Sequence, residues 1–341
     1  MKKRPTLTDV AKAAGVSRSA AAKALLNTGG DQVRVAATTR TRIEAAAKQM
    51  HYAPNRLAQQ LRQGSSKTIG VILDSINVPV MSQRLFALEA AASRKGYRLL
   101  VGQTHCEDET LEEYVADFAG RGTEAILCLF DLAPGRDERA TRSFGAFRKV
   151  VFHGRAAWPG GYAVQVDTQS AIHRCVDHLA ARGKKNPALS LWNAASDELM
   201  ALRRTAFVEQ TKQHGMKNWV WDAAADDNSP TTEILIGGID FMVGQCHADA
   251  ILASNDIWAT RYILELQKKG LRVPEDVAVI GYDNLDIAEV VSPSLTTIDQ
   301  CHQDYANKAL ELLLEIADGR KIPAAERTRK VNCQLIERGS A

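Results

Sequence analysis

The sequence of 341 residues predicts two different units: an all-α head of three helices in a helix-turn-helix arrangement, and a larger α/β unit of two lobes with parallel sheets. Three observations support this prediction. Residues 1–64 carry 12 Lys and Arg against 3 Asp and Glu, whereas the other 277 residues carry 31 against 37. Two short helical patterns flank a glycine near the N-terminus. Beyond residue 66, short apolar runs alternate with helical patterns, as in parallel sheets with helical crossovers.

The basic head on a mildly acidic body indicates a partner that is a polyanion. The overall composition, 45% hydrophobic and 24% charged, is that of an ordinary globular protein. No run approaches the roughly 18 to 20 apolar residues of a membrane span, and the basic opening lacks the apolar segment of a signal peptide. The six cysteines are scattered without metal-like spacing, which favours reduced thiols. We therefore expect a cytoplasmic protein with no membrane partner, no metal and no cofactor.

The first helix of the head is expected to begin near Leu7. Thr6 and Asp9 have the spacing of a capping box, in which each side chain bonds the backbone N–H of the other residue. Gly15 supplies the turn residue that adopts a positive φ without steric cost. The apolar stripe of this helix comprises Val10, Ala11 and Ala14.

The second helix is expected to follow Ser17, whose hydroxyl suits an N-cap. Helical spacing divides its residues into two stripes. The small apolar stripe, fit for close packing on the first helix, comprises Ala20, Ala21, Ala24 and Leu25. The opposite, basic stripe comprises Arg18, Ser19, Ala22 and Lys23. Two helices about a glycine, the second presenting cations near its N-terminus, form a helix-turn-helix pattern.

A third helix is predicted in residues 38–52, with Thr38 or Thr39 as its N-cap. In the next segment, "APNRLAQQLRQGSS", Leu57, Ala58 and Leu61 share one face over about two turns. A helix this short is marginal in water, so we expect it to order only when it is paired and docked. The Gly-Ser-Ser that follows is typical of a flexible linker.

The body is expected to contain two successive sets of buried strands. The first set comprises "TIGVIL", "YRLLVG", "EAILCLF" and "KVVFHG", and the second "ALSLWN", "WVWDA", "DAILAS" and "VAVIGYD". Two sets indicate two lobes, with ligands beyond the carboxyl ends of the strands. The expected boundaries are 1–52 for the head, 53–66 for the hinge helix and linker, 67–165 plus 296–325 for lobe 1, and 166–295 plus 326–341 for lobe 2.

Candidate ligand contacts follow from positions at strand ends. Asp283 ends a strand, where a buried carboxylate accepts hydroxyl donors. Asn255 follows a strand and opens a helix with Asp256, so helix capping explains it as well as ligand binding does. Further candidates at strand ends or in the loops after them are Asp74, Met81, Phe130, His153 and Trp192. Among the tryptophans, Trp219 and Trp221 are less favoured for stacking on a sugar, because core packing is the more common fate.

The stretches "TLTDVAKAAGVS", "TRTRIEAAAKQMHYAPNRLAQQLR" and "KTIGVIL" together resemble the LacI/GalR family of transcriptional regulators. The segment "DAILASNDIWATRYILELQKKGLRVPEDVAVIGYDNLDIAEVVSPSLTTI" resembles the core of that family's effector domain, which is similar to periplasmic sugar-binding proteins of type I. The resemblance implies a DNA-binding head, a hinge helix and a two-lobed effector and dimerisation domain. It is weakest in residues 131–165 and 215–245.

Residue roles follow from the resemblance by motif position. Residues implied to face base edges in the major groove are Arg18, Ser19 and Lys23, with Ala22 between them. Residues implied to hold phosphates or the hinge are Thr6, Ser17, Asn27, Thr39, Tyr52, Asn55 and Arg56. Leu61 matches the leucine that is wedged into the central base step of the minor groove. Arg203 matches a ligand-contacting arginine, although Arg204 beside it is an alternative.

Several positions depart from the family pattern. Alanine stands at 20, 22 and 36, where the family usually has Thr, Ser and Ser. The changes at 22 and 36 remove a hydroxyl for phosphate and the usual cap of the third helix. The loop "NTGGDQVRV" is about three residues longer than usual, so Arg34 either adds a phosphate contact or lies in a solvated loop. Arg261 replaces a usual glycine.

These observations predict a homodimeric, sequence-specific repressor that binds a pseudo-palindromic operator in double-stranded DNA under control of a small-molecule effector. A sugar is the first expectation for the effector, and a nucleobase acting as co-repressor is the alternative. A rival from another class is a solute-binding protein of the same body fold. An enzyme is disfavoured because the sequence lacks a P-loop and the G-x-S-x-G, H-E-x-x-H and strand-linked G-x-G-x-x-G motifs. The tail "NCQLIERGSA" lacks a leucine heptad, which disfavours a tetramer.

Overall fold

The computed structural model divides into two compact units, residues 1–66 and residues 67–341. The structure describes residues 5–26, 35–52, 65–105, 107–130, 132, 137–192, 198–223 and 231–341.

The described residues of the head form three helices, α1 (Leu7–Ala13), α2 (Arg18–Leu26) and α3 (Ala37–Gln49). The predicted capping box is confirmed: the Asp9 amide donates to Thr6 Oγ1 at 3.3 Å, and the Thr6 amide donates to Asp9 Oδ2 at 2.8 Å. Gly15 has a φ of 62° at the turn, as expected. The Ala20 amide donates to Ser17 Oγ at 3.1 Å, so Ser17 caps α2.

Small residues let the three helices of the head approach closely. Ala21 of α2 is fully buried together with Val10 of α1 and Ile43 of α3. The predicted N-cap of α3 is wrong, because the helix begins before Thr38 and its N-cap is Ala36, which offers no side-chain hydrogen bond. Alanine extends a helix readily, so the start shifts into the alanine pair and the threonines lie inside the first turn.

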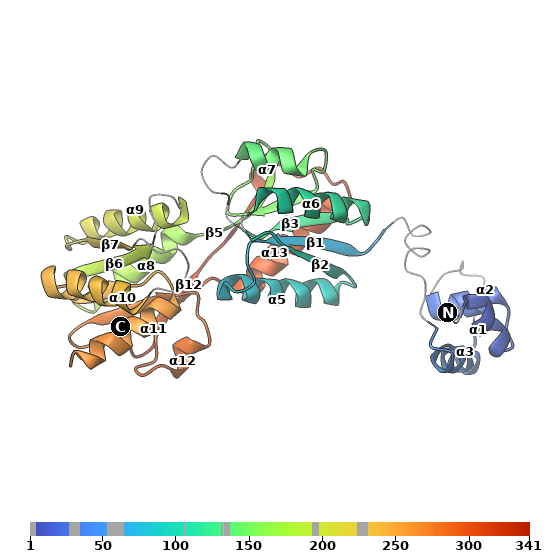
Figure 1. Ribbon diagram of the computed structural model, residues 1–341, viewed down its shortest axis with the longest axis horizontal. Helices are drawn as coiled ribbons and strands as arrows, with labels where there is room; N and C mark the ends of the chain where they lie inside the picture. The colour runs from blue at the N-terminus through green and yellow to red at the C-terminus, as the bar shows by residue number, and fades with distance from the viewer. Residues whose placement is uncertain are drawn as a thin grey trace. The chain divides into compact units, whose positions relative to one another are not determined.

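The body contains two six-stranded sheets, one in each lobe (Figure 1). The first sheet is parallel throughout and has the order β11-β5-β4-β3-β1-β2. Its strands are β1 (Thr68–Leu73), β2 (Arg98–Gln103), β3 (Ala125–Cys128), β4 (Val150–His153), β5 (Tyr162–Val166) and β11 (Thr328–Val331). The second sheet has the order β12-β10-β9-β8-β6-β7, with β12 antiparallel to β10. Its strands are β6 (Pro187–Trp192), β7 (Trp219–Ala223), β8 (Ala250–Leu252), β9 (Ala278–Tyr282), β10 (Thr296–Asp299) and β12 (Gln334–Ile336).

Helices cover both faces of each sheet, which explains why the strands are almost continuously apolar (Figure 1). In lobe 1, α5 and α13 lie on one face and α6 and α7 on the other; in lobe 2, α8 and α9 oppose α10 and α11. The bounds are α5 (Pro79–Arg94), α6 (Asp108–Gly120), α7 (Asp137–Phe144), α8 (Thr168–Ala181), α9 (Glu198–Gln213), α10 (Thr232–Ile239), a π-helix η1 (Asp240–Gln245), α11 (Asp256–Lys268), α12 (Ile287–Val290), α13 (His302–Ala317) and a 3-10 helix η2 (Ala324–Glu326).

The chain crosses between the lobes three times: after β5, after β10 and after β11. The expected lobe boundaries therefore need two corrections. Residues 296–299 form β10 of the second sheet rather than part of lobe 1, and residues 328–331 form β11 of the first sheet rather than part of lobe 2. Both strands have four residues, and β11, "TRKV", is an edge strand with little apolar character, so neither gives a clear strand pattern.

We predict that Ala21→Leu unfolds the head, because its Cβ lies in a fully packed three-helix core. Overpacking a core typically costs about 1–3 kcal/mol, and a small head has little stability to lose. Binding to DNA and resistance of the head to limited proteolysis should both fall, while the thermal transition of the body stays unchanged. Ala13→Leu, at an exposed position of α1, is the matched control. Wild-type behaviour of Ala21→Leu in both assays would contradict the packing argument.

Candidate functional site

Helix α2 presents a basic, exposed face on the side away from the core of the head. Arg18 and Ser19 are exposed, and Ala22 and Lys23 are half-exposed, whereas Ala21 and Ala24 are buried. The four residues predicted to read bases therefore occupy one face of one helix. A polar, short-chained helix face of this kind fits the width of the major groove.

The residues predicted to hold phosphate have mixed placements. The Thr6 hydroxyl donates to Asp9 Oδ2 at 2.7 Å, and Ser17 Oγ accepts from Ala20 and lies 3.0 Å from Ser19 Oγ, so both hydroxyls serve helix ends as well. Thr39 and Tyr52 are half-exposed, and burial raises the pKa of Tyr52. The remaining candidates, Asn27, Asn55, Arg56 and Leu61, and also Arg34, lie outside the described residues.

In lobe 2, one of the two neighbouring arginines is turned inward. Arg203 of α9 is 4% exposed, whereas Arg204 is exposed. Arg203 Nη1 donates to the Ser254 carbonyl at 2.5 Å, and its guanidinium lies 3.7 Å from the centroid of the Tyr282 ring. These contacts place the Arg203 guanidinium beside the carboxyl ends of β8 and β9.

Asp283 follows β9 with a φ of 108° and is buried. Its Oδ1 accepts a hydrogen bond of 2.5 Å from Gln300 Nε2. Burial raises the pKa of Asp283 to about 6, although Arg203, Gln300 and Arg84 all act in the opposite direction. A buried carboxylate with a raised pKa at the end of a strand is typical of a functional site.

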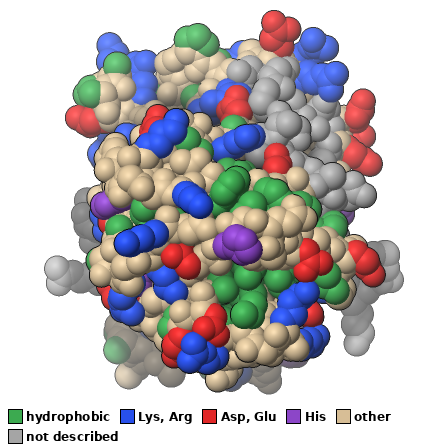
Figure 2. All heavy atoms as spheres, turned by 90° about the vertical axis from the view of Figure 1, so that its left-hand side faces the viewer, with side chains coloured by type: hydrophobic (Ala, Val, Ile, Leu, Met, Phe, Trp, Pro, Cys, Tyr) green, Lys and Arg blue, Asp and Glu red, His purple; other side chains and the backbone are tan. Residues whose placement is uncertain are grey.

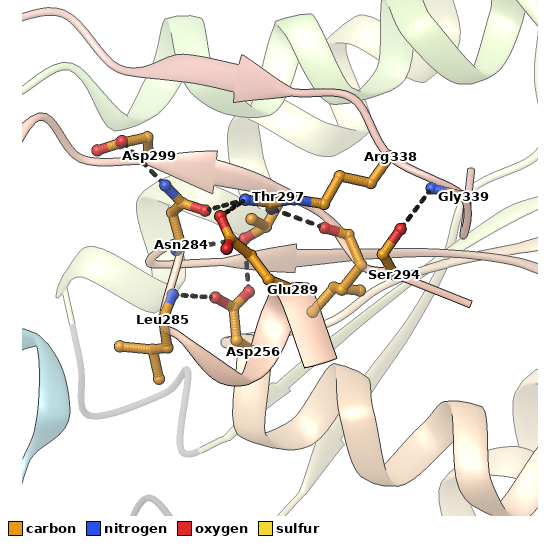
Figure 3. Close-up of polar contacts among 10 residues, drawn as sticks. Asp256, Asn284, Leu285, Glu289, Ser294, Thr297, Asp299, Arg338 and Gly339 are labelled. Carbon is orange, nitrogen blue, oxygen red and sulfur yellow. Dashed lines mark hydrogen bonds and ion pairs between the residues drawn. The ribbon is translucent and has the colours of Figure 1, made fainter. Parts of the chain in front are cut away.

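A polar scaffold fixes the turn that carries Asp283 (Figure 3). Asp256 is fully buried; it accepts from the Leu285 amide at 2.7 Å and from Thr297 Oγ1 at 2.5 Å. Burial raises the pKa of Asp256 to about 7. Gly281 is required beside it, because a Cβ at that position would lie 2.2 Å from Asp256 Oδ1.

The scaffold extends from this turn to the C-terminal segment (Figure 3). Arg338 Nη2 donates to Asn284 Oδ1 at 2.9 Å and to Glu289 Oε1 at 3.1 Å. Asn284 Nδ2 donates to Asp299 Oδ2 at 3.0 Å. Our reading of the sequence did not predict these roles, although the adjacent Asp283 and Asn284 in "GYDN" are residue types that tolerate a positive φ.

In lobe 1, Arg84 occupies the buried stripe of α5, a position that the sequence motifs do not mark as functional. Its Nη1 donates to His153 Nε2 at 2.9 Å, and its Nη2 donates to Gln300 Oε1 at 2.5 Å. Since arginine only donates, His153 Nε2 accepts, and His153 Nδ1 donates to Tyr305 Oη at 3.1 Å. Burial and the charge of Arg84 lower the pKa of His153 well below its ordinary value. The detectable signal was a cation on the same helical stripe as Leu88 and Ala91.

Gln300 thus joins the two lobes, because its amide accepts from Arg84 of lobe 1 and donates to Asp283 of lobe 2. Two of the effector contacts expected from the sequence, His153 and Asp283, are linked by hydrogen bonds through Arg84 and Gln300. The charge of Arg203 also acts on Asp283, and Met81 Sδ lies 3.9 Å from Arg84 Nη1.

The other candidates have local roles. Asp74 accepts from Thr104 Oγ1 at 2.5 Å, and Asn255 accepts from the Trp258 amide at 2.9 Å and caps α11. Phe130 packs in the core cluster between the first sheet and α6 and α7. Trp192 is half-buried and stacks on Trp258 at 6.0 Å between ring centroids.

The two less favoured tryptophans pack beside the second sheet. The Trp219 Nε1 donates to Asn186 Oδ1 at 2.8 Å, and Trp221 lies against Phe241 at 5.5 Å between ring centroids. Across the described part of the chain, no helix is both long enough and apolar enough to span a membrane.

Comparisons with known proteins agree with these features. The profile of the family "Bacterial regulatory proteins, lacI family" matches residues 6–55, and that of the "Periplasmic binding protein-like domain" matches residues 176–341. The transcriptional repressor CytR of Escherichia coli is 25% identical, covering 98% of this chain and 96% of CytR. The ribose operon repressor of Bacillus subtilis is 29% identical, covering 94% of each chain. The repressor PurR of Vibrio cholerae is 25% identical, covering 98% of this chain and 97% of PurR.

Solved structures share the fold over the full chain. The Lac repressor dimer bound to operator and the anti-inducer ONPF has a TM-score of 0.81 at 22% identity, covering 99% of both chains. The complex of the regulator CelR with cellobiose has a TM-score of 0.68 at 22% identity, covering 99% of this chain and all of that one. The curated relatives are transcriptional repressors, which confirms the expectation of a regulator rather than an enzyme. With a lacI-type head on a periplasmic-binding-protein-like body, the chain belongs to the LacI family of DNA-binding transcriptional repressors.

Proposed function

We propose that the chain acts as a homodimer on a pseudo-palindromic operator, and that a small-molecule effector, a sugar or sugar derivative, controls its affinity for DNA. The observation that carries this proposal is the joint presence of an exposed basic helix face in the head and a buried, strongly coupled polar site at the strand ends of the body. Coupling between two distinct sites must be reciprocal, so DNA binding in turn changes the affinity for the effector.

The DNA-binding part rests on α2. Arg18 and Lys23 lie on the face opposite the buried alanines, where they meet base edges and phosphates when the helix enters the major groove. Ala22 lies between them and offers a methyl group rather than a hydroxyl, which suits a thymine methyl. In our proposal, the hinge helices pair in the minor groove with Leu61 wedged between base pairs.

The homodimer is supported by large apolar side chains on the surface of the body. In lobe 1, Phe86 of α5 and Val101 of the edge strand β2 are exposed. In lobe 2, Leu264 of α11 and Val290 of α12 are exposed, and Figure 2 shows hydrophobic side chains gathered between charged ones on one face. Two-fold pairing of the bodies brings two heads to one DNA site, so the operator carries the same symmetry.

The effector part rests on Asp283, Asn255 and Arg203. A carboxylate accepts paired hydroxyl groups, an amide accepts and donates, and a guanidinium donates, which is the mixture that a polyhydroxylated ligand needs. A sugar is supported as the effector because one relative is a ribose operon repressor and one structural neighbour is a complex of CelR with cellobiose. A nucleobase acting as co-repressor is the second candidate. A ligand that bridges the lobes shifts the populations of their arrangements by its differential affinity, and through them the hinge.

We predict that Arg18→Ala lowers operator affinity by about 1–3 kcal/mol and narrows the ratio of specific to non-specific binding, because a base contact is lost. Fluorescence anisotropy on DNA from upstream of the gene, titrated against salt, measures both quantities. Lys48→Ala removes a cation from an exposed site of α3 and is the matched control, expected to weaken binding to all sequences alike. If Arg18→Ala lost the same affinity for operator and for non-specific DNA, the proposed base contact would be contradicted. If the wild-type protein bound no DNA sequence specifically, with or without effectors, the proposal of a regulator would be refuted.

We predict that Asp283→Asn shifts the response of operator binding to higher effector concentrations. The loss of a buried charged acceptor costs about 1–3 kcal/mol of effector binding. Gel shifts across an effector titration test this, with the exposed Asp286→Asn as control. An effector response at unshifted concentrations in Asp283→Asn would place the ligand elsewhere.

A further inference from the structure

Each lobe contributes one buried guanidinium group whose charge acts on Asp283. Arg84 is 3% exposed and Arg203 is 4% exposed. Within the described residues, the hydrogen-bond acceptors of Arg84 are His153, Gln300 and the sulfur of Met81, and that of Arg203 is the Ser254 carbonyl. None of these acceptors carries a negative charge. The Nε atoms of both arginines are buried without a hydrogen-bond partner.

The surroundings leave this positive charge poorly compensated. Asp283, whose pKa is about 6, is a carboxylate at neutral pH, and both arginines lower its pKa. It supplies one negative charge against two guanidinium groups, and its Oδ1 already accepts from Gln300. Burial, followed by the charge of Arg84, lowers the pKa of His302 to about 4, as it lowers that of His153. The charge of Arg84 thus acts on both histidines, and neither of them supplies a compensating negative charge.

Aromatic rings offset part of the burial. Tyr305 lies 5.0 Å from the Arg84 guanidinium and Tyr282 lies 3.7 Å from that of Arg203, measured to the ring centroids. A cation–π contact is weaker than the penalty for burying an unpaired charge. The two guanidinium groups share one carboxylate, Asp283, so a net positive charge remains among the described residues around them.

The helix ends beside Arg84 have the same electrostatic sign. Arg84 lies in the second turn of α5 and contacts Gln300 and Tyr305, which flank the start of α13. Neither α5 nor α13 has a side-chain hydrogen bond at its N-cap. The positive ends of two 16-residue helices thus lie near the buried guanidinium group of Arg84.

We propose that the effector is a hydroxylated anion, a sugar acid or a sugar phosphate, whose acidic group lies against Arg84 and Arg203 while its hydroxyls meet Asp283 and Asn255. This proposal rests on the proposed function and narrows the class of its effector. Charge-assisted and forked hydrogen bonds from arginine suit both carboxylate and phosphate, so the test must distinguish these two sources. A neutral sugar or nucleobase would add no negative charge, so the two buried cations would still share the single carboxylate of Asp283.

The test uses the full chain and matched ligands: glucose, glucuronate and glucose 6-phosphate, and ribose, ribonate and ribose 5-phosphate, with hypoxanthine as a neutral base and inorganic phosphate alone as the anion control. Thermal shift ranks the ligands and calorimetry gives their affinities. We expect at least one acid or phosphate to bind about 10-fold or more tightly than its neutral parent, as charge-assisted bonds provide. The carboxylate and phosphate arms identify the acidic group. The proposal is overturned if no anion exceeds its parent, or if inorganic phosphate binds as tightly as the sugar phosphate.

Two variants locate the effect. Arg84→Gln should abolish the roughly 10-fold preference for the charged ligand, and Arg84→Lys should retain part of it, because lysine keeps the charge but loses the fork. Arg121→Gln, an exposed arginine of lobe 1 paired with Asp117, is the control that should bind like wild type. If Arg84→Gln does not fold, Arg84→Lys and the wild-type ranking decide. An unchanged preference in Arg84→Gln overturns the assignment.

Operator binding separates this inference from the proposed function. A chain whose operator affinity responds to a neutral sugar or base keeps the function and loses the anionic effector. A chain that binds no operator specifically loses the proposed function, whatever its affinity for anions.

Discussion

The chain of hydrogen bonds from Arg84 through Gln300 to Asp283 is the interaction on which the rest of the body depends. It joins a helix of lobe 1 to a strand end of lobe 2 through a residue in the crossing segment. Both ends are buried, so neither can exchange its partner for water without movement of the lobes. The relative position of the lobes is therefore linked to the protonation and hydrogen bonding of Asp283. A ligand that contacts the same atoms can change both together.

The backbone around Asp283 is held in place by contacts with neighbouring residues. Asp256 accepts from the amide of Leu285, and only glycine fits at position 281 beside it. A turn with two consecutive positive-φ residues, Asp283 and Asn284, is costly unless its surroundings fix it. The buried Asp256 thus positions Asp283, and Arg338 fixes the side-chain amide of Asn284.

Local patterns predicted the parts whose periodicity and capping are self-contained. The capping box of Thr6 and Asp9, the turn at Gly15 and the buried apolar runs of both sheets needed no long-range information. The short strands β10 and β11 were misassigned because four-residue strands with few apolar side chains acquire their identity from their neighbours in the sheet. The start of α3 differs from the prediction because alanine, a strong helix former, sets no sharp boundary.

The site was predictable only where a family motif or a strand end marked it. Asp283 and Arg203 follow from such marks, whereas Arg84 and Gln300 do not, since their role arises from contacts across more than 200 positions of sequence.

Long-range pairing also orders events during synthesis. Because α13 packs on α5 and the first sheet, and β11 completes that sheet, lobe 1 lacks its last helix and strand until lobe 2 has been translated. The ribosome therefore delivers a nearly complete second lobe before the first can close its core, and early folding intermediates expose the apolar face of α5.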